Sequence, residues 1–223
     1  MNPDLQPLYS RLGYVFTDEK LLIRALSHRS VGKNNNERFE FLGDSVLGYV
    51  IAEELFVKYP NDNEGKLSRY RSTLVRGETL AEIAMKFKIG DFLLLGGGEL
   101  KSGGFRRASI LSDALEAIIG AIVLDSDINT AKNCVLSWFK DRIAIVDQEI
   151  LKDPKSRLQE YLQSKKIALP HYEICLVEGK EHNQTFHINC QIKALDIVAS
   201  AKGSSRRNAE QQAAVNALEM LKN

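Results

Sequence analysis

The chain lacks any long uninterrupted run of apolar residues. Over 223 positions it is 44% hydrophobic and 26% charged, and no stretch of about 18 uncharged apolar residues occurs, which argues against a membrane span. The first ten residues, MNPDLQPLYS, also lack the basic-then-apolar pattern of a secretion signal. We therefore expect a globular cytoplasmic protein without a membrane partner.

Cysteine and net charge are scarce as well. The three cysteines, Cys134, Cys175 and Cys190, are odd in number and show no metal-binding spacing, so we expect buried, reduced thiols. The formal net charge is only +1, which by itself indicates no particular partner. Any binding to nucleic acid must come from the local placement of charge.

The residue pattern divides the chain in two. Residues 1–150 are predicted to form helices joined by polar or glycine-rich loops, including the loop GGGELKSGGFRR at 96–107. Asp153 and Pro154 are typical of a helix N-cap and first helical position. After Pro170 the apolar period changes to two, which predicts three strands and then a final helix. The expected fold is an all-α domain at 1–150 followed by a small α+β (α-β-β-β-α) domain at 151–223.

Carboxylates interrupt one of the most apolar stretches, NERFEFLGDSVLGYV at 36–50. On a helix, Glu37, Glu40 and Asp44 fall within an arc of about 60°. The rest of this helix is apolar nearly all round, which predicts a central position. Glu40 and Asp44 repel one another at i and i+4, and a buried carboxylate is costly unless a cation compensates it.

A second apolar stretch, SILSDALEAIIGAIVL, repeats the pattern with Asp113 and Glu116. Two helices with inward carboxylates can share divalent cations, and oxygen-only ligands favour Mg²⁺ or Mn²⁺. Such a cation can activate water and stabilise phosphodiester cleavage. Gly43, Gly48 and Gly120 inside the two helices predict a close approach. The alternative is that the carboxylates lie on the solvent faces of amphipathic helices.

Three blocks of sequence together resemble the ribonuclease III family. NNERFEFLGDSVL is similar to the family signature, and LGGGELKSGGFRRASILSDALEAIIGAI to a second family stretch in the correct order and spacing. KDPKSRLQEYLQ and GSSRRNAEQQAA resemble the two ends of the double-stranded RNA-binding domain that bacterial members carry C-terminally. The resemblance covers essentially the whole chain. It implies a Mg²⁺-dependent endonuclease, with Mn²⁺ as a substitute, that cleaves double-stranded RNA to 5′-phosphate and 3′-hydroxyl ends with short 3′ overhangs. Precursors of ribosomal RNA and some messenger RNAs are the implied substrates.

The resemblance also implies roles for particular residues. It matches Asp44 and Glu116 to the positions most directly tied to catalysis, and it implies a homodimer formed through the catalytic domain. Apolar residues of FEFLGDSVL would then lie partly in the interface. Ala108 and Asn208 depart from the glutamate and lysine that many relatives have. The implied metal ligands are Glu40, Asp44, Asp113 and Glu116; the further acidic positions of the catalytic valley are Glu37 and Glu64, with Glu99 of less certain role.

The C-terminal part offers candidate contacts to RNA at three places. A-form RNA is recognised through its shape, 2′-hydroxyls and phosphates. By resemblance, Gln159 lies on a helix that enters one minor groove, and His182 lies in a loop that reaches a second. Lys202, Arg206 and Arg207 stand just before and at the start of the last helix, where free N–H groups add to their charge in holding phosphate. Taken one by one, an exposed histidine or an arginine pair near a helix start is usually part of an ordinary solvated surface, and Gln159 alone is uninformative.

Two other functions compete with the endonuclease. A non-catalytic protein could bind double-stranded RNA and hold a structural metal, although such a protein would be free to lose one of the four matched ligands. A metal-dependent hydrolase of small phosphate esters would have no use for the α-β-β-β-α unit.

Overall fold

The structure is a computed structural model that describes residues 4–151, 153–179 and 184–221. The chain separates into two compact units, Met1–Val146 and Asp147–Asn223, and each is described by itself. No helix within the described ranges is long and apolar enough to cross a membrane.

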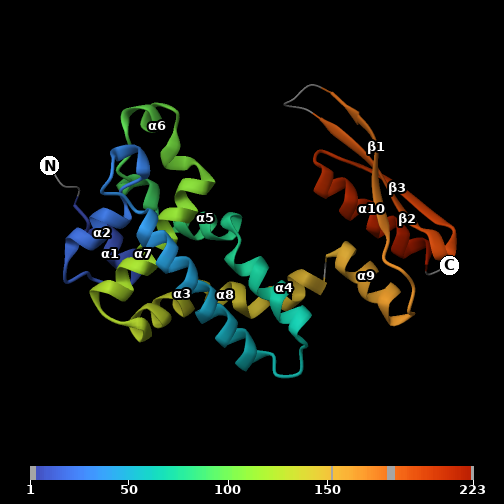
Figure 1. Cartoon of the computed structure of the whole chain (residues 1–223), viewed down its shortest axis with the longest axis horizontal. Helices are drawn as coiled ribbons and strands as arrows, with labels where there is room; N and C mark the ends of the chain where they lie inside the picture. Colours follow the sequence, from blue (N-terminus) through green and yellow to red (C-terminus); the bar gives the residue numbers. More distant parts are fainter. Residues whose placement is uncertain (1–3, 152, 180–183, 222–223) are drawn as a thin grey trace. The chain divides into compact units, whose positions relative to one another are not determined.

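Unit 1 is all helical, as the sequence predicts (Figure 1). Short 3₁₀ turns connect several of its helices. Its helices are α1 (Gln6–Leu12), α2 (Glu19–Ala25), α3 (Glu37–Lys58), α4 (Glu64–Val75), α5 (Gly77–Lys86), α6 (Gly97–Lys101), α7 (Ala108–Asp125) and α8 (Ile128–Leu151), the last of which continues into unit 2.

The centre of unit 1 is α7, which packs against α2, α3 and α5. Leu115, Ile118 and Ile119 are fully buried, because α7 carries apolar residues on almost its whole surface. The prediction that α3 is central holds only for one face. On its other face, Phe41 and Phe56 are 78% and 72% exposed. Apolar residues all round a helix therefore accompany two different environments: α7 is buried in the core, whereas α3 has one buried and one exposed face.

Glycine allows α3 and α7 to cross with their backbones in contact. A Cβ built on Gly43 would overlap the carbonyl oxygen of Glu116 and lie 2.6 Å from its carbonyl carbon. One built on Gly120 would overlap the carbonyl oxygen of Phe39. The predicted close approach is thus confirmed at two positions. It is wrong at Gly48, where no described atom lies within 4 Å of such a Cβ.

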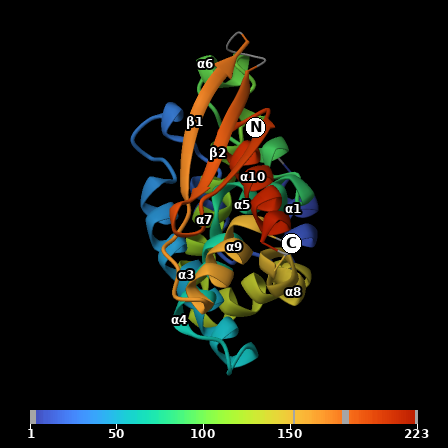
Figure 2. The same cartoon turned by 90° about the vertical axis from the view of Figure 1, so that its right-hand side faces the viewer.

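Unit 2 is the expected α-β-β-β-α unit. Its three strands form an antiparallel sheet in the order β1-β2-β3, and Figures 1 and 2 show the two helices on one face of the sheet. Buried alanines of the last helix let it pack closely on Ile188 and Cys190. The elements are α9 (Pro154–Ser164), β1 (His171–Glu178), β2 (Thr185–Ile192), β3 (Ile197–Gly203) and α10 (Arg206–Met220).

Two local predictions from the sequence are wrong. The segment 96–107 is not a plain loop, because it contains α6 and a 3₁₀ turn at Gly104–Arg106. The cysteines are free thiols, but only Cys190 is buried. Cys175 is exposed on β1, where the register shifts between Ile174 and Leu176.

Candidate functional site

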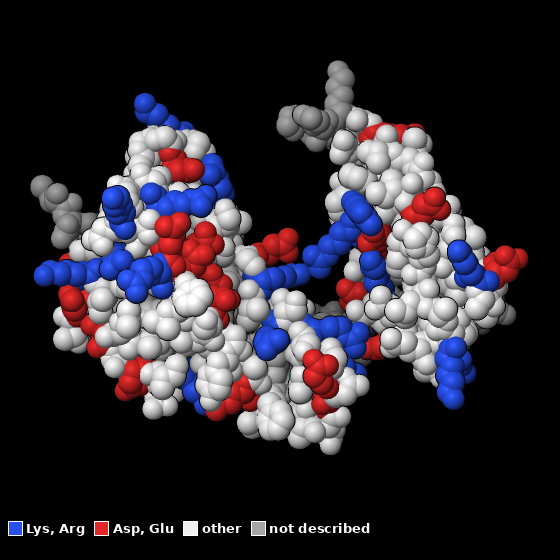
Figure 3. All heavy atoms as spheres, in the orientation of Figure 1, with Lys and Arg blue, Asp and Glu red and all other residues white. Residues whose placement is uncertain are grey.

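A pocket of about 570 Å³ in unit 1 gathers most of the predicted carboxylates. Its walls come from the segment before α3, the first turns of α3, α6 and the first half of α7. Figure 3 shows a cluster of acidic side chains on the face of unit 1, with basic side chains beside it. Among the described residues, the carboxylates that line this acidic pocket are Glu37, Glu40, Asp44, Glu99, Asp113 and Glu116.

Three of these carboxylates could hold one metal ion. Glu40, Asp113 and Glu116 each offer an oxygen, and these oxygens lie within 4.8 Å of one another. All three side chains are partly buried. Asp44 lines the same pocket but is exposed and does not belong to this closest group. A donor set made only of carboxylate oxygens fits a hard cation such as Mg²⁺.

The electrostatics of the group also fit a cation. The pKa of Glu116 is raised to about 8, mainly by burial and in addition by the nearby carboxylates of Asp44, Asp113 and Glu40. Burial also raises the pKa of Glu40, with Asp113 and Glu37 adding to the effect and Arg29 opposing it. These shifts mean that the cluster resists carrying all its negative charges at once. A divalent cation would remove this cost.

Burial likewise raises the pKa of Asp113, against the lowering effects of a hydrogen bond from Ser112 and the charges of His28 and Arg29. His28 lies in the pocket wall. Its Nδ1 accepts a hydrogen bond from the Ser30 backbone N–H at 3.2 Å and lies 2.8 Å from Ser30 Oγ. His28 thereby caps the 3₁₀ turn at Arg29–Val31, which is a structural role.

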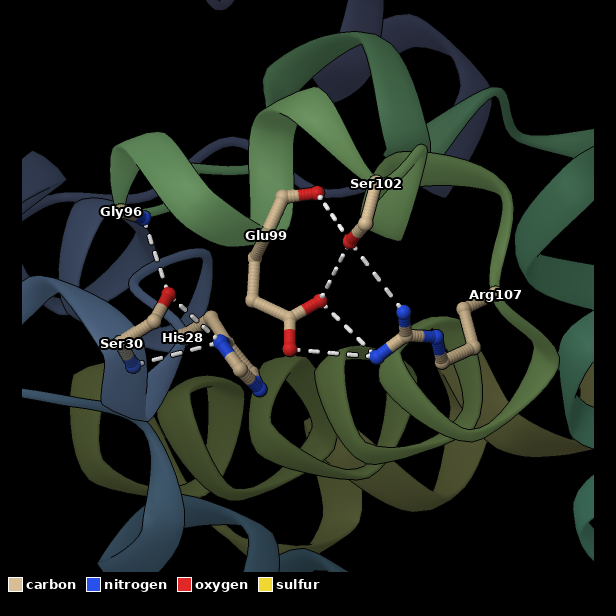
Figure 4. A network of polar contacts seen from close by, with 6 residues as sticks. All are labelled: His28, Ser30, Gly96, Glu99, Ser102 and Arg107. Carbon is tan, nitrogen blue, oxygen red and sulfur yellow. Dashed lines mark hydrogen bonds and ion pairs between the residues drawn. The ribbon is translucent and has the colours of Figure 1, made fainter.

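Local structure explains how the carboxylates come together. Because the backbones of α3 and α7 touch at Gly43, Glu40, about one helical turn before it, and Asp44, directly after it, both come near Glu116. The loop carrying His28 is tied to the segment before α6. Ser30 Oγ accepts a hydrogen bond from Gly96 N at 2.9 Å (Figure 4).

Glu99 differs from the other carboxylates because it is already paired. Arg107 forms an ion pair with Glu99 at 2.9 Å, and Ser102 Oγ hydrogen-bonds to the Glu99 carbonyl at 3.1 Å (Figure 4). This pair joins α6 to the start of α7 across the pocket wall. Ala108 begins α7, whose first turn contains no acidic residue.

The structure does not bring Glu64 into the acidic pocket of its own chain. Glu64 begins α4 and accepts a hydrogen bond from Ser68 Oγ at 2.8 Å. It lines a separate, mainly apolar pocket between α3 and α4, together with Leu55 and Phe56.

In unit 2 the predicted RNA contacts lie on separate elements. Gln159 is on α9, and Lys202 is exposed near the end of β3, opposite His187 in the register. Arg206 and Arg207 are exposed in the first turn of α10. The predicted contact at His182 lies outside the described residues.

Arg206 has an intramolecular partner that sequence reasoning missed. Its Nε donates to Glu210 at 2.8 Å, and Glu210 also pairs with Lys155 at 2.6 Å. The i, i+4 spacing of Arg206 and Glu210 was a signal that could have revealed half of this arrangement. Sequence reasoning also missed Arg29, Asn36 and Arg107 in the wall of the acidic pocket; Asn36 immediately precedes the first carboxylate of α3.

The structure is that of a protein in which a helical unit with a carboxylate pocket is followed by a small α-β-β-β-α unit. Comparison with known families is specific for both parts. The family described as ribonuclease-III-like matches residues 18–143, and the double-stranded RNA binding motif matches residues 154–221. The chain belongs to the ribonuclease III family.

Full-length relatives support this assignment. The chain is 54% identical to ribonuclease 3 of Vibrio cholerae, with all of both chains covered. It is 53% identical to ribonuclease 3 of Aliivibrio fischeri, with 99% of this chain and 100% of the relative covered. The nuclease domain of ribonuclease III from Campylobacter jejuni superimposes with a TM-score of 0.61 at 47% identity, covering 62% of this chain and 97% of that one. The resemblance, the fold class and the type of enzyme expected from the sequence are confirmed.

Proposed function

We propose that the chain is a divalent-metal-dependent endonuclease that hydrolyses phosphodiester bonds of double-stranded RNA. The products would carry 5′-phosphate and 3′-hydroxyl ends with short 3′ overhangs. The observation that carries this proposal is the convergence of Glu40, Asp113 and Glu116 within 4.8 Å in a chain that also matches the double-stranded RNA binding motif.

The metal site consists of Glu40, Asp44, Asp113 and Glu116, and its ion is Mg²⁺, with Mn²⁺ as a substitute. When bound there, the ion would supply an activated water and charge stabilisation at the phosphate. Asp44 and Glu116 act closest to the chemistry. Burial and neighbouring carboxylates favour the protonated form of Glu116, so ligand binding must ionise it before the full charge of the cluster is available.

The RNA-binding surface of unit 2 includes Gln159, His182, Lys202, Arg206 and Arg207. Lys202 and both arginines are exposed around the N-terminus of α10, where backbone N–H groups also favour phosphate. Because Glu210 holds one side of Arg206, we expect Lys202 to contribute more to phosphate binding than Arg206 does.

We further propose that the protein is a homodimer formed through unit 1. Phe41, Tyr49 and Phe56 are 78%, 57% and 72% exposed along α3, and exposed apolar patches are typical of interaction surfaces. The Campylobacter jejuni structure concerns a region involved in dimer formation of its nuclease domain. Since Glu64 lies apart from the acidic pocket of its own chain, a role for Glu64 and Glu37 in one catalytic valley requires the dimer.

The domains of this enzyme are residues 1–150 and 151–223. This boundary lies four residues after the division of the compact units at Val146 and Asp147. It is supported by the end of α8 at Leu151 and by Asp153, which caps α9 by accepting from Ser156 N at 2.9 Å. We place the enzyme in the cytoplasm, where it would process ribosomal RNA precursors and some messenger RNAs.

The deciding experiment compares the wild type with Glu116→Gln on a long perfect RNA duplex. Cleavage and binding are followed separately with Mg²⁺, with Ca²⁺ and with chelator. We expect Mg²⁺-dependent cutting by the wild type, and loss of cutting but not of binding in the variant. Glu54→Gln, which removes a carboxylate of α3 outside the acidic pocket, is the matched control and should cut normally.

The alternative is a double-stranded RNA-binding protein without catalysis. Binding without cutting by the wild type, with every metal ion tried, would favour it and would contradict the proposed endonuclease.

A further inference from the structure

The first turn of α9 is tied to α10 through Glu210. This residue is 9% exposed, and its carboxylate accepts from Lys155 Nζ of α9 at 2.6 Å and from Arg206 Nε of α10 at 2.8 Å. Lys155 Nζ also lies 4.3 Å from the centre of the Tyr172 ring on β1. Burial acts to raise the pKa of Glu210, but the hydrogen bonds from Lys155 and Arg206 outweigh it and lower the pKa. An ionised carboxylate therefore lies where α9, α10 and β1 meet.

Gln211, the next residue of α10, makes a second connection to the same turn. Its Nε2 donates to Asp153 Oδ2 at 2.8 Å, and its Oε1 accepts from Lys155 N at 3.3 Å. Asp153 is the N-cap of α9, and its other carboxylate oxygen accepts from Ser156 N. Two adjacent residues of α10 thus hold both the cap and the first turn of α9.

The packing of α9 against α10 leaves a role for these polar contacts. The two helices lie together on one face of the sheet (Figures 1 and 2). Besides Glu210, the buried residues of α10 are Ala209, Ala213, Ala214 and Ala217. Small side chains present shallow ridges, so they fix the position of one helix along another only weakly. A buried ion pair adds little net stability, because desolvation offsets its attraction, so the network sets the position of α9 on α10 more than it adds stability.

We propose that Glu210 and Gln211 are positioning residues for RNA recognition. They fix the distance between Gln159 on α9 and the two arginines at the start of α10, so that both helices can contact one A-form duplex at once. A-form RNA is recognised through its shape, which requires a fixed spacing between the protein groups that contact it. The inference rests on the proposed RNA-binding surface of unit 2, and it adds the residues that give this surface its geometry.

The test compares the affinities of the full chain for an RNA duplex and for a DNA duplex of the same sequence, at low salt and with chelator in place of Mg²⁺. Gln211→Ala changes no charge, and it should bind the RNA duplex about 10-fold more weakly than the wild type, which is the contribution of one hydrogen bond to a charged group. Affinity for DNA comes mainly from phosphate charge and should change by less than about 2-fold. Gln212→Ala, which alters an exposed neighbour, is the matched control and should bind both duplexes like the wild type.

Glu210→Gln tests the charged half of the network. The variant keeps the size of the side chain but cannot pair with both Lys155 and Arg206, so its RNA affinity should also fall about 10-fold. Glu219→Gln removes the same charge from an exposed position of α10, and it should leave the affinity for RNA unchanged or slightly raised. If Glu210 merely repelled phosphate, Glu210→Gln would instead bind both RNA and DNA more tightly, which would overturn the inference.

Two further measurements separate positioning from unfolding and from chemistry. Binding is measured well below the unfolding temperature of each variant, and Gln211→Ala decides the question if Glu210→Gln does not fold. Since the acidic pocket lies in unit 1, the single-turnover cutting rate with Mg²⁺ at saturating protein should not change. Unchanged RNA affinity in Gln211→Ala, or an equal loss of its RNA and DNA affinities, would overturn the inference. A wild type that binds the two duplexes equally well would instead refute the proposed RNA-binding surface, and this inference with it.

Discussion

The crossing of α3 and α7 provides the sharpest prediction, because one methyl group should disturb both stability and the metal site. In Gly43→Ala the new Cβ would overlap the carbonyl oxygen of Glu116, and it would lie 2.6 Å from its carbonyl carbon and 3.0 Å from Gly120 N. Carbon atoms prefer separations of about 3.5–4.0 Å. All three neighbours are backbone atoms, so no side-chain rotation can relieve the overlap, and α3 must move away from α7.

The cost follows from two opposing effects. Overpacking a tight core typically costs about 1–3 kcal/mol, and a clash with backbone lies at the top of that range or above it. Replacing glycine by alanine inside a helix returns at most about 1 kcal/mol. We therefore expect a net loss of about 2–3 kcal/mol, which for a chain of this length lowers the unfolding temperature by about 4–12 °C.

The assay is thermal unfolding at fixed protomer concentration, with and without Mg²⁺. Gly98→Ala in α6 is the control, because no described atom lies within 4 Å of its added Cβ, and it should unfold at the wild-type temperature or slightly above. Gly43→Ala should also show less stabilisation by Mg²⁺, since the carboxylates of the two helices are moved apart. Wild-type unfolding and a wild-type response to Mg²⁺ would refute this account of the crossing.

Three further predictions concern charge, RNA and assembly. The pKa of Glu116 is raised to about 8 in the folded protein. The metal-free protein should therefore lose stability as pH rises from about 4.5 towards 8, because the unfolded chain releases this proton first. The loss is up to about 1.4 kcal/mol of unfolding free energy per pH unit. The increase in unfolding temperature caused by Mg²⁺ should therefore grow between pH 6 and pH 8, and an increase that is the same at both pH values would contradict the raised pKa. Lys202→Ala should weaken duplex binding and reduce the slope of log K against log salt by about 1. Its single-turnover cutting rate at saturating protein should not change. The control Lys193→Ala should leave the slope unchanged. Phe56→Ser should weaken the dimer by on the order of 100-fold or more, because the contact is lost in both copies, and light scattering at micromolar protein would detect the monomer; Val15→Ser, at another exposed apolar residue, should remain dimeric.

Local chemistry made much of the fold predictable. Apolar periodicity and Pro60, which act within a few residues, predict a helix over residues 37–59, and α3 covers Glu37–Lys58. The segment LDIVASA at 195–201 predicts the last strand. The strand lies at Ile197–Gly203, since a 3₁₀ turn at Lys193–Leu195 delays its start.

From the sequence alone one can predict which helices carry paired carboxylates on one face and in which order the elements follow. Spacing at i+3 and i+4 is a property of one helix, so Glu40 with Asp44, and Asp113 with Glu116, could be read without any tertiary structure. Family resemblance then related these pairs to a metal site.

Which of these groups come into contact depends on the packing between elements. It placed Glu40, Asp113 and Glu116 closest together, paired Glu99 with Arg107, and left Asn36 Nδ2 without an acceptor among the described residues. These outcomes depend on how closely two helices cross and on how a loop folds back over them. Sequence spacing along one helix contains no information about such distances between elements.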